Sequence, residues 1–163
     1  MHRVIANLCT TRRSLRRAFG EHTLDAIEAA IKASEREHSG ELRFAVETAL
    51  DLPALLGGVS ARQRAVEAFA SLHTWDTEAN NGVLIYLLLA ERDIEIVADR
   101  GYNGLVSAQQ WEAVCREMEA AFARSEFEAG ALLGIRRISA LIAEHFPPRD
   151  DDRDELPNRP TLL

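Results

Sequence analysis

The chain has 163 residues, 47% of them hydrophobic, and a formal net charge of −7. This length and composition predict one domain with its own apolar core, and the acidic balance argues against nucleic acid as a partner. The two cysteines, Cys9 and Cys115, lack the spacing of a disulfide framework or a zinc site and suit a reducing compartment. No stretch has the roughly 18 apolar residues of a membrane span, and the N-terminus does not resemble a secretory signal, so we expect a cytoplasmic protein.

Residues 1–18 are expected to form a basic, helical arm. This segment has no acidic residue and five arginines, which are Arg3, Arg12, Arg13, Arg16 and Arg17. A terminal helix of this kind can pack against its own domain or fray. Because apolar residues lie between the arginines, it could also lie on an anionic membrane surface. The second interpretation would bring the domain, and a protein partner that the sequence does not identify, to the inner face of the membrane.

Residues 19–147 predict an α/β domain. Leu24, Ile27 and Ile31 recur at helical spacing, with Thr23 as the expected N-cap. Alternating apolar residues near 41–48 predict the first strand. Three later helices are each expected to begin with a capping box, a hydroxyl followed three positions on by Gln or Glu. The three pairs are Ser60 with Gln63, Ser107 with Gln110, and Ser125 with Glu128.

Two further strands complete the expected sheet. The apolar run near 83–90 predicts a strand covered on both faces, and a short turn leads to a partner strand near 93–99. A helical crossover makes the first two strands parallel, and the hairpin makes the third antiparallel. We therefore expect a three-layer α/β/α sandwich with a small mixed sheet and helices on both faces. Residues 148–163 predict a charged, proline-containing, extended tail whose last apolar residues could dock on the domain.

This topology brings polar residues to one edge of the sheet, where the first two strands begin and the third ends. The residues expected there are Glu41, Asp76, Glu78, Asn80, Asn81, Asp99 and Arg100. Oxygen ligands at this density suit Ca²⁺ or Mg²⁺, and the Arg100 guanidinium could hold a phosphate. His38 and His73 lie near the same edge, where one could act as an acid or base. The alternative is structural, because acids at loop ends are usually solvated or caps, Asn-Asn-Gly is ordinary turn sequence, and a lone histidine is most often a surface residue.

The two hairpin strands resemble sequences of the TPM-domain family. The first is Asn80-Asn81-Gly82-Val83-Leu84-Ile85-Tyr86, and the second runs from Ile94 to Tyr102. Phe122, Phe127-Glu128-Ala129-Gly130 and Gly134-Ile135 are similar to a third family stretch, and the resemblance covers roughly Thr23 to His145. It implies an α/β/α sandwich, a divalent-metal site and, in some members, phosphatase activity. The chain departs from the family where Asn80 replaces the usual Asp of D-N-G and where Asp99-Arg100 stands in the G-Y-G segment.

Two functions from different classes follow. In the first, the chain is a non-catalytic or weakly catalytic interaction module with a Ca²⁺ or Mg²⁺ site and no organic cofactor. In the second, it is a metal-dependent acid-phosphatase-like hydrolase of phosphomonoesters. Asp76, Glu78, Asp99 and Glu41 would then hold the ion, and Arg100 would neutralise the developing phosphoryl charge. No positioned nucleophile is recognisable, because Ser39 and Thr77 offer hydroxyls that nothing in the sequence shows to be activated. The sequence therefore favours the first function.

Overall fold

The computed structural model describes residues 2–149 and 154–163 of the chain. The helices are α1 (His2–Cys9), α2 (Arg12–Ala18), α3 (Glu21–Ser34), α4 (Leu52–Leu56), α5 (Ala61–Ser71), α6 (Ala108–Ala123) and α7 (Phe127–His145), with a 3₁₀ turn η1 (Arg100–Tyr102). The strands are β1 (Glu41–Glu47), β2 (Gly82–Leu88), β3 (Asp93–Ala98) and β4 (Thr161–Leu162). The expected α/β class and the order of the main elements are confirmed.

The strands form one mixed sheet in the order β3-β2-β1-β4. β1 and β2 are parallel with Glu41 opposite Gly82, and β2 and β3 form the expected antiparallel hairpin. The sequence did not predict the fourth strand, β4, in which the end of the tail pairs with β1 in parallel. Leu163 N donates to Val46 O at 2.8 Å, so the tail covers the backbone groups that β1 would otherwise expose as a sheet edge.

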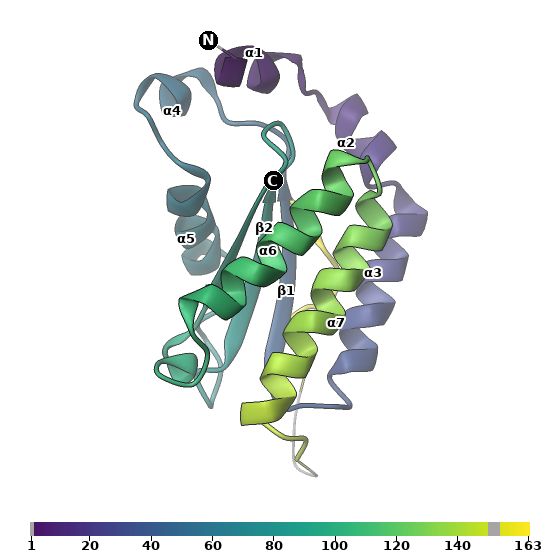
Figure 1. Cartoon of the computed structure of the whole chain (residues 1–163), viewed down its shortest axis with the longest axis vertical. Helices are drawn as coiled ribbons and strands as arrows, with labels where there is room; N and C mark the ends of the chain where they lie inside the picture. The colour runs from purple at the N-terminus through teal and green to yellow at the C-terminus, as the bar shows by residue number, and fades with distance from the viewer. Residues whose placement is uncertain (1, 150–153) are drawn as a thin grey trace.

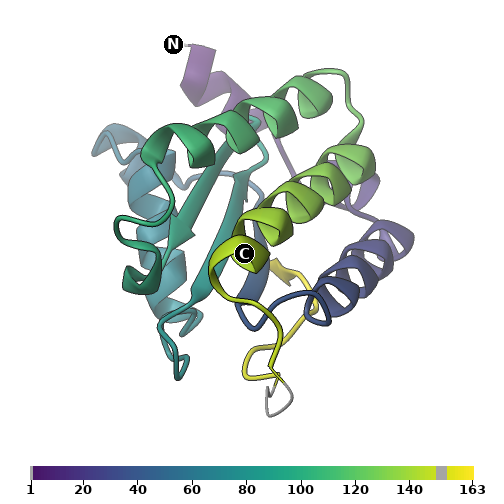
Figure 2. The same cartoon turned by 60° about the horizontal axis from the view of Figure 1, so that its bottom comes forward.

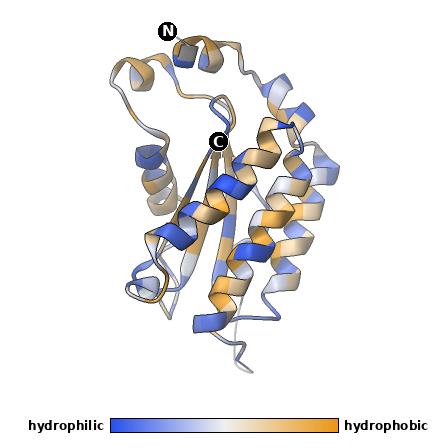
Figure 3. Ribbon diagram, viewed as in Figure 1, coloured by the Kyte–Doolittle hydropathy of each residue, from blue (hydrophilic) through white to orange (hydrophobic). Residues whose placement is uncertain are grey.

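The helices form a layer on each face of this sheet, as expected for an α/β/α sandwich. Figures 1 and 2 show α3, α6 and α7 side by side on one face and α5 on the other. Leu42, Phe44 and Val46 of β1 point into the larger core beneath the three helices, whereas Ala45 belongs to the smaller core under α5. Figure 3 shows hydrophobic residues, in orange, along these helices and the strands. Every residue of β1 and β2 is therefore buried.

Two of the three predicted capping boxes are present, and the third is wrong. Ser60 and Ser107 cap α5 and α6 with the expected Gln partners. Ser125 instead has a φ of 63° and ends α6. Its N–H donates to Phe122 O, and Glu126 N donates to Ala121 O, which is the Schellman arrangement of a helix C-terminus. The turn between α6 and α7 is too short for Ser125 to begin the next helix as well.

The predicted N-cap of α3 is also wrong, because α3 begins one turn earlier than expected. Gly20 is the N-cap, and Thr23 lies within the first turn of the helix. The Thr23 hydroxyl donates to the Glu128 carboxylate of α7 at 2.9 Å. Thr23, expected as an N-cap, and Glu128, expected as the capping-box partner of Ser125, therefore join α3 to α7 instead.

The first two helices lie against the domain at the end of the sheet where β1 ends. Leu15 of α2 and Phe19 belong to the larger core. Asn7 of α1 is buried, and its amide oxygen accepts from Leu50 N at 2.7 Å. Across residues 2–149 and 154–163, no helix is long and apolar enough to cross a membrane.

Candidate metal site at the sheet edge

The edge where β1 and β2 begin and β3 ends is held together by backbone contacts. Glu41 N donates to Asn81 O at 3.3 Å, and Asp99 N donates to Gly82 O at 2.9 Å. The Tyr102 hydroxyl donates to Asn81 O at 2.8 Å. The structure thus places Glu41, Asn81 and Asp99 on three adjacent strand ends, as the topology predicted.

Close backbone approach at this edge explains one of its glycines. Gly101 N donates to Asn80 O at 2.9 Å, and a Cβ at position 101 would lie 2.4 Å from the same oxygen. Asn80 has a φ of 52°, a left-handed conformation that asparagine tolerates better than most residues. The loop before β2 and the loop after β3 therefore pack directly on each other.

Asn81 and Asp99 each present a buried side-chain oxygen with no hydrogen-bond donor among the described residues. Asn81 is 1% exposed, and its amide nitrogen donates to Ser39 O at 2.7 Å, which leaves Oδ1 as the unsatisfied atom. Asp99 begins η1, where its Oδ1 accepts from Arg100 N at 2.7 Å and its Oδ2 is buried. Buried polar atoms normally have a partner, so these two oxygens are the strongest indication of a bound group at this edge.

Arg100 is exposed and is oriented by Asn80. Its Nε donates to Asn80 Oδ1 at 2.8 Å. The Asn80 side chain, which stands where the resembling family has an Asp, therefore already accepts a hydrogen bond from the Arg100 guanidinium. Asp76 and Glu78 are exposed in the segment that leads into β2. Within this segment, the backbone N–H of Glu78 donates to Glu155 Oε2 of the tail at 3.1 Å.

Glu41 is buried, 3% exposed, and faces the tail. Its two carboxylate oxygens accept the backbone N–H groups of Glu155 and Leu156 at 3.1 and 3.2 Å. Burial raises its pKa to about 7, an effect that the two N–H groups oppose and that the negative charges of Asp154 and Glu155 reinforce. Glu41 therefore fastens the tail to the start of β1.

Glu41 belongs to a cluster of three carboxylates that the sequence did not predict. One oxygen each from Glu35, Glu41 and Asp154 lies within 4.8 Å of the others. Asn158 donates its amide to both Glu35 and Asp154, at 3.0 and 3.1 Å. Neither Glu35 nor Asp154 carried a sequence signal, because only the folding of the tail onto β1 brings them to Glu41. Among the described residues, the carboxylates that cluster at this edge are therefore those of Glu41, Glu35 and Asp154. The expected partners of Glu41, which were Asp76, Glu78 and Asp99, are not part of this cluster.

The two candidate histidines differ in environment. His38 is completely buried, so the expectation of a surface residue was wrong for it. His73 is exposed, has a φ of 54° and packs its ring 5.9 Å from that of Trp75. The candidate hydroxyl of Thr77 accepts from Asn81 N at 3.0 Å and so stabilises the turn before β2.

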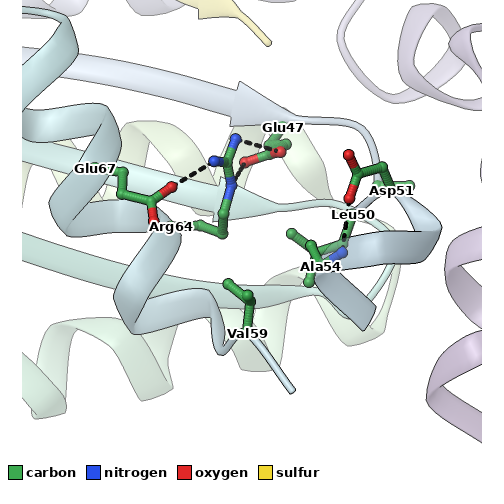
Figure 4. Close-up of a pocket in the computed structure, with 8 residues that line it drawn as sticks. Glu47, Leu50, Asp51, Ala54, Val59, Arg64 and Glu67 are labelled. Carbon is green, nitrogen blue, oxygen red and sulfur yellow. Dashed lines mark hydrogen bonds and ion pairs between the residues drawn. The ribbon is translucent and has the colours of Figure 1, made fainter. Parts of the chain in front are cut away.

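A second polar cluster, also missed, lies at the opposite end of the sheet (Figure 4). Arg64 of α5 donates to both carboxylate oxygens of Glu47, at 3.1 and 2.9 Å, and to Glu67 at 2.5 Å. The buried Tyr86 hydroxyl also donates to Glu47. Glu47, Arg64 and Glu67 line a pocket of about 290 Å³ together with Leu50 and Asp51. Arg64 thus faces two carboxylates, and its contact with both oxygens of Glu47 is a partly buried ion pair that joins α5 to β1.

The TPM domain family matches residues 16–141, most of this α/β fold, and the chain belongs to that family. It is 30% identical to the BA42 protein from the psychrophilic bacterium Bizionia argentinensis, whose structure superposes with a TM-score of 0.76 over 87% of this chain and 93% of that one. The N-terminal domain of the cg2496 protein from Corynebacterium glutamicum shares the fold at 13% identity, with a TM-score of 0.54 over 76% of this chain and 73% of that one. No curated protein matches this chain.

Proposed function

We propose that this chain is a non-catalytic accessory module that binds a divalent cation, Ca²⁺ or Mg²⁺, where β1 and β2 begin. The observation that carries this proposal is the pair of buried oxygens, Asn81 Oδ1 and Asp99 Oδ2, for which the described residues supply no donor. Leaving such an atom unsatisfied costs about 1–3 kcal/mol. Carboxylate and amide oxygens are the ligands that both ions prefer, and Asp99 adds a negative charge.

The other residues expected as ligands have weaker claims in this proposal. Glu41 already accepts two backbone N–H groups, and Asn80 already accepts from Arg100. Asp76 and Glu78 are exposed, so binding an ion would require ordering their side chains at an entropic cost. Asn81 and Asp99 would therefore hold the ion first, and a bound cation would supply a positive charge between two strand ends.

A non-catalytic role is supported by how the candidate catalytic groups are used. The Thr77 hydroxyl accepts a backbone N–H, His38 is completely buried, and His73 packs on Trp75. A nucleophile needs an adjacent base in hydrogen-bond reach. The contacts found for these side chains are those of residues that shape the two loops.

The cysteines support a proposed location in the cytoplasm. Cys9 and Cys115 are both free thiols, the first exposed and the second partly buried. Exposed thiols persist where the redox potential keeps them reduced. Fractionation of cells that express the chain would test this location, and recovery from an oxidising compartment would contradict it.

Thermal unfolding in EDTA, Ca²⁺ and Mg²⁺ tests the ion site, because a ligand of the native state raises the midpoint. At a hundredfold excess over Kd the gain is about 2.7 kcal/mol, roughly 5 to 10 °C for a domain of this size. Asp99→Asn keeps the shape and the oxygen that caps η1 but removes the charge. It should lose most of the shift while matching the wild type in EDTA. Asp76→Asn, an exposed change in the same region, should keep the shift. An undiminished shift in Asp99→Asn would refute the assignment.

The alternative function, metal-dependent hydrolysis of phosphomonoesters, is favoured by one observation. Asn80 fixes the exposed guanidinium of Arg100 beside Asp99, a placement suited to a phosphate group. Hydrolysis of p-nitrophenyl phosphate by the metal-loaded protein would support this function, provided that Arg100→Ala abolishes it and the exposed Arg36→Ala does not. We expect no turnover above that of Arg100→Ala.

A further inference from the structure

We propose that the end of the molecule opposite the candidate metal site, formed by α1, α2 and α4, binds the surface of an anionic phospholipid bilayer. This inference does not depend on the proposed cation site. It rests on three observations: an exposed apolar surface, a segregation of positive charge beside it, and a basic cavity between them and the body of the domain.

The apolar surface combines two helices that are distant in sequence. Ile5 and Leu8 of α1 are 56% and 64% exposed, and Leu52 and Leu56 of α4 are 49% and 77% exposed. These are four of the most exposed large apolar side chains among the described residues. Apolar groups left in water in this way mark surfaces that bind a partner or a membrane.

Hydrogen bonds join α1 to both sides of α4. Leu50, which precedes α4, donates its N–H to Asn7 Oδ1 at 2.7 Å. Val59, which follows α4, accepts from the Arg3 guanidinium at 2.6 Å. Figures 1 and 2 show the two helices next to each other at the same end of the molecule, and Figure 3 shows hydrophobic residues on both. Helix α1 is therefore anchored beside α4 and is not a frayed terminus, so both helices present their exposed apolar side chains at this end of the molecule.

Positive charge is concentrated beside this surface. The first 18 residues hold five of the 19 basic residues of the chain and none of its 26 acidic residues. In α2, Leu15 points into the core while Arg12, Arg13, Arg16 and Arg17 are exposed. An acidic protein would be repelled by an anionic bilayer everywhere except at such an end. The charge pattern thus favours a lipid surface over a second, equally acidic copy of the chain.

A cavity of about 440 Å³ lies between α2 and the turn of the hairpin. Arg17 and Arg92 line it together with the hydroxyl-bearing residues Thr10, Ser14 and Ser125. Two guanidinium groups and neighbouring hydroxyls are the donors that a phosphate group prefers. In this proposal the cavity receives a lipid phosphate while the leucines of α1 and α4 enter the interface.

Flotation of the full chain with lipid vesicles tests the proposal. The protein should float with vesicles that contain phosphatidylglycerol and not with phosphatidylcholine alone, and high salt should release it. Arg12→Gln with Arg16→Gln should weaken binding about 30-fold, from about 1 kcal/mol for each arginine at the lipid surface. Leu8→Gln with Leu56→Gln should also weaken binding, through the loss of two apolar anchors.

Matched controls lie outside this end of the molecule. Leu105→Gln changes another exposed leucine, 46% exposed, which lies near the candidate metal site. Arg36→Gln with Arg136→Gln removes the same charge from the segment after α3 and from α7. All variants should keep the wild-type unfolding midpoint, and the controls should bind like the wild type. Three results would overturn the proposal: no flotation with anionic vesicles, equal binding by test and control variants, or sedimentation showing a dimer that only the leucine variant disrupts.

Discussion

Glu41 gives a prediction whose sign and size follow from its burial. Its folded pKa of about 7 lies above 4.5, the ordinary value of a glutamate, so the native state binds the proton more tightly than the unfolded state does. Its contribution to the free energy of unfolding is therefore fully present below 4.5 and is lost as the pH rises through 7. Integrating between about pH 5 and about pH 8 gives a loss of about 2–3 kcal/mol from this one carboxyl.

The change Glu41→Gln removes this titration and keeps the shape of the side chain. Urea unfolding of both proteins in EDTA, followed by circular dichroism, gives the free energy of unfolding at each pH. The variant should gain on the wild type by about 2–3 kcal/mol between about pH 5 and about pH 8, because the titration of groups distant from Glu41 cancels in the difference. Glu37→Gln, an exposed change nearby, should show a constant difference. A constant difference for Glu41→Gln as well would refute the buried, tail-facing carboxylate.

Two further predictions concern packing. Arg64→Met leaves the buried Glu47 carboxylate without its ion pair and should lower the free energy of unfolding in urea by about 2–4 kcal/mol, less than for a fully buried pair because Arg64 is about one-third exposed. A result within 0.5 kcal/mol of the wild type, roughly the effect of an ordinary surface change, would contradict a structural role for the pair. In Gly134→Ala the added methyl would lie 2.2 Å from Met118 Sδ, so the midpoint of thermal unfolding should fall, corresponding to about 1–3 kcal/mol of overpacking; an unchanged midpoint would show that the Met118 side chain repacks to make room.

The main strands were predictable because their patterns are local. Leu42, Phe44 and Val46 alternate with Arg43, Ala45 and Glu47, and this alternation predicted the strand that the structure contains. The alternation did not predict that Arg43 and Glu47 on the other face are also buried. Their burial depends on α5, which supplies Arg64 to Glu47, and on the tail, which supplies Thr161 to Arg43 at 2.9 Å. The residue pattern of one strand does not reveal partners that come from other elements of the fold.

The sheet edge was predictable only in outline. Topology alone brought Glu41, Asn81 and Asp99 to adjacent strand ends. It did not show that the Glu41 carboxylate would be taken by the N–H groups of Glu155 and Leu156, more than a hundred positions later. The tail pairs with β1 over two residues only and is also held by the buried Leu156 and by ion pairs of Arg159 with α3, contacts between distant positions that leave no periodic signal in the sequence.

The most direct test of the central claim is a titration of the ¹⁵N-labelled protein with Ca²⁺ and with Mg²⁺, followed by amide chemical shifts. The proposed site predicts that the largest changes fall on Asn81, Gly82, Asp99 and Arg100, and that Asp99→Asn removes them. Changes confined to Glu35, Glu41 and Asp154 would assign the ion to that cluster of carboxylates instead. No change with either ion would contradict the cation site itself.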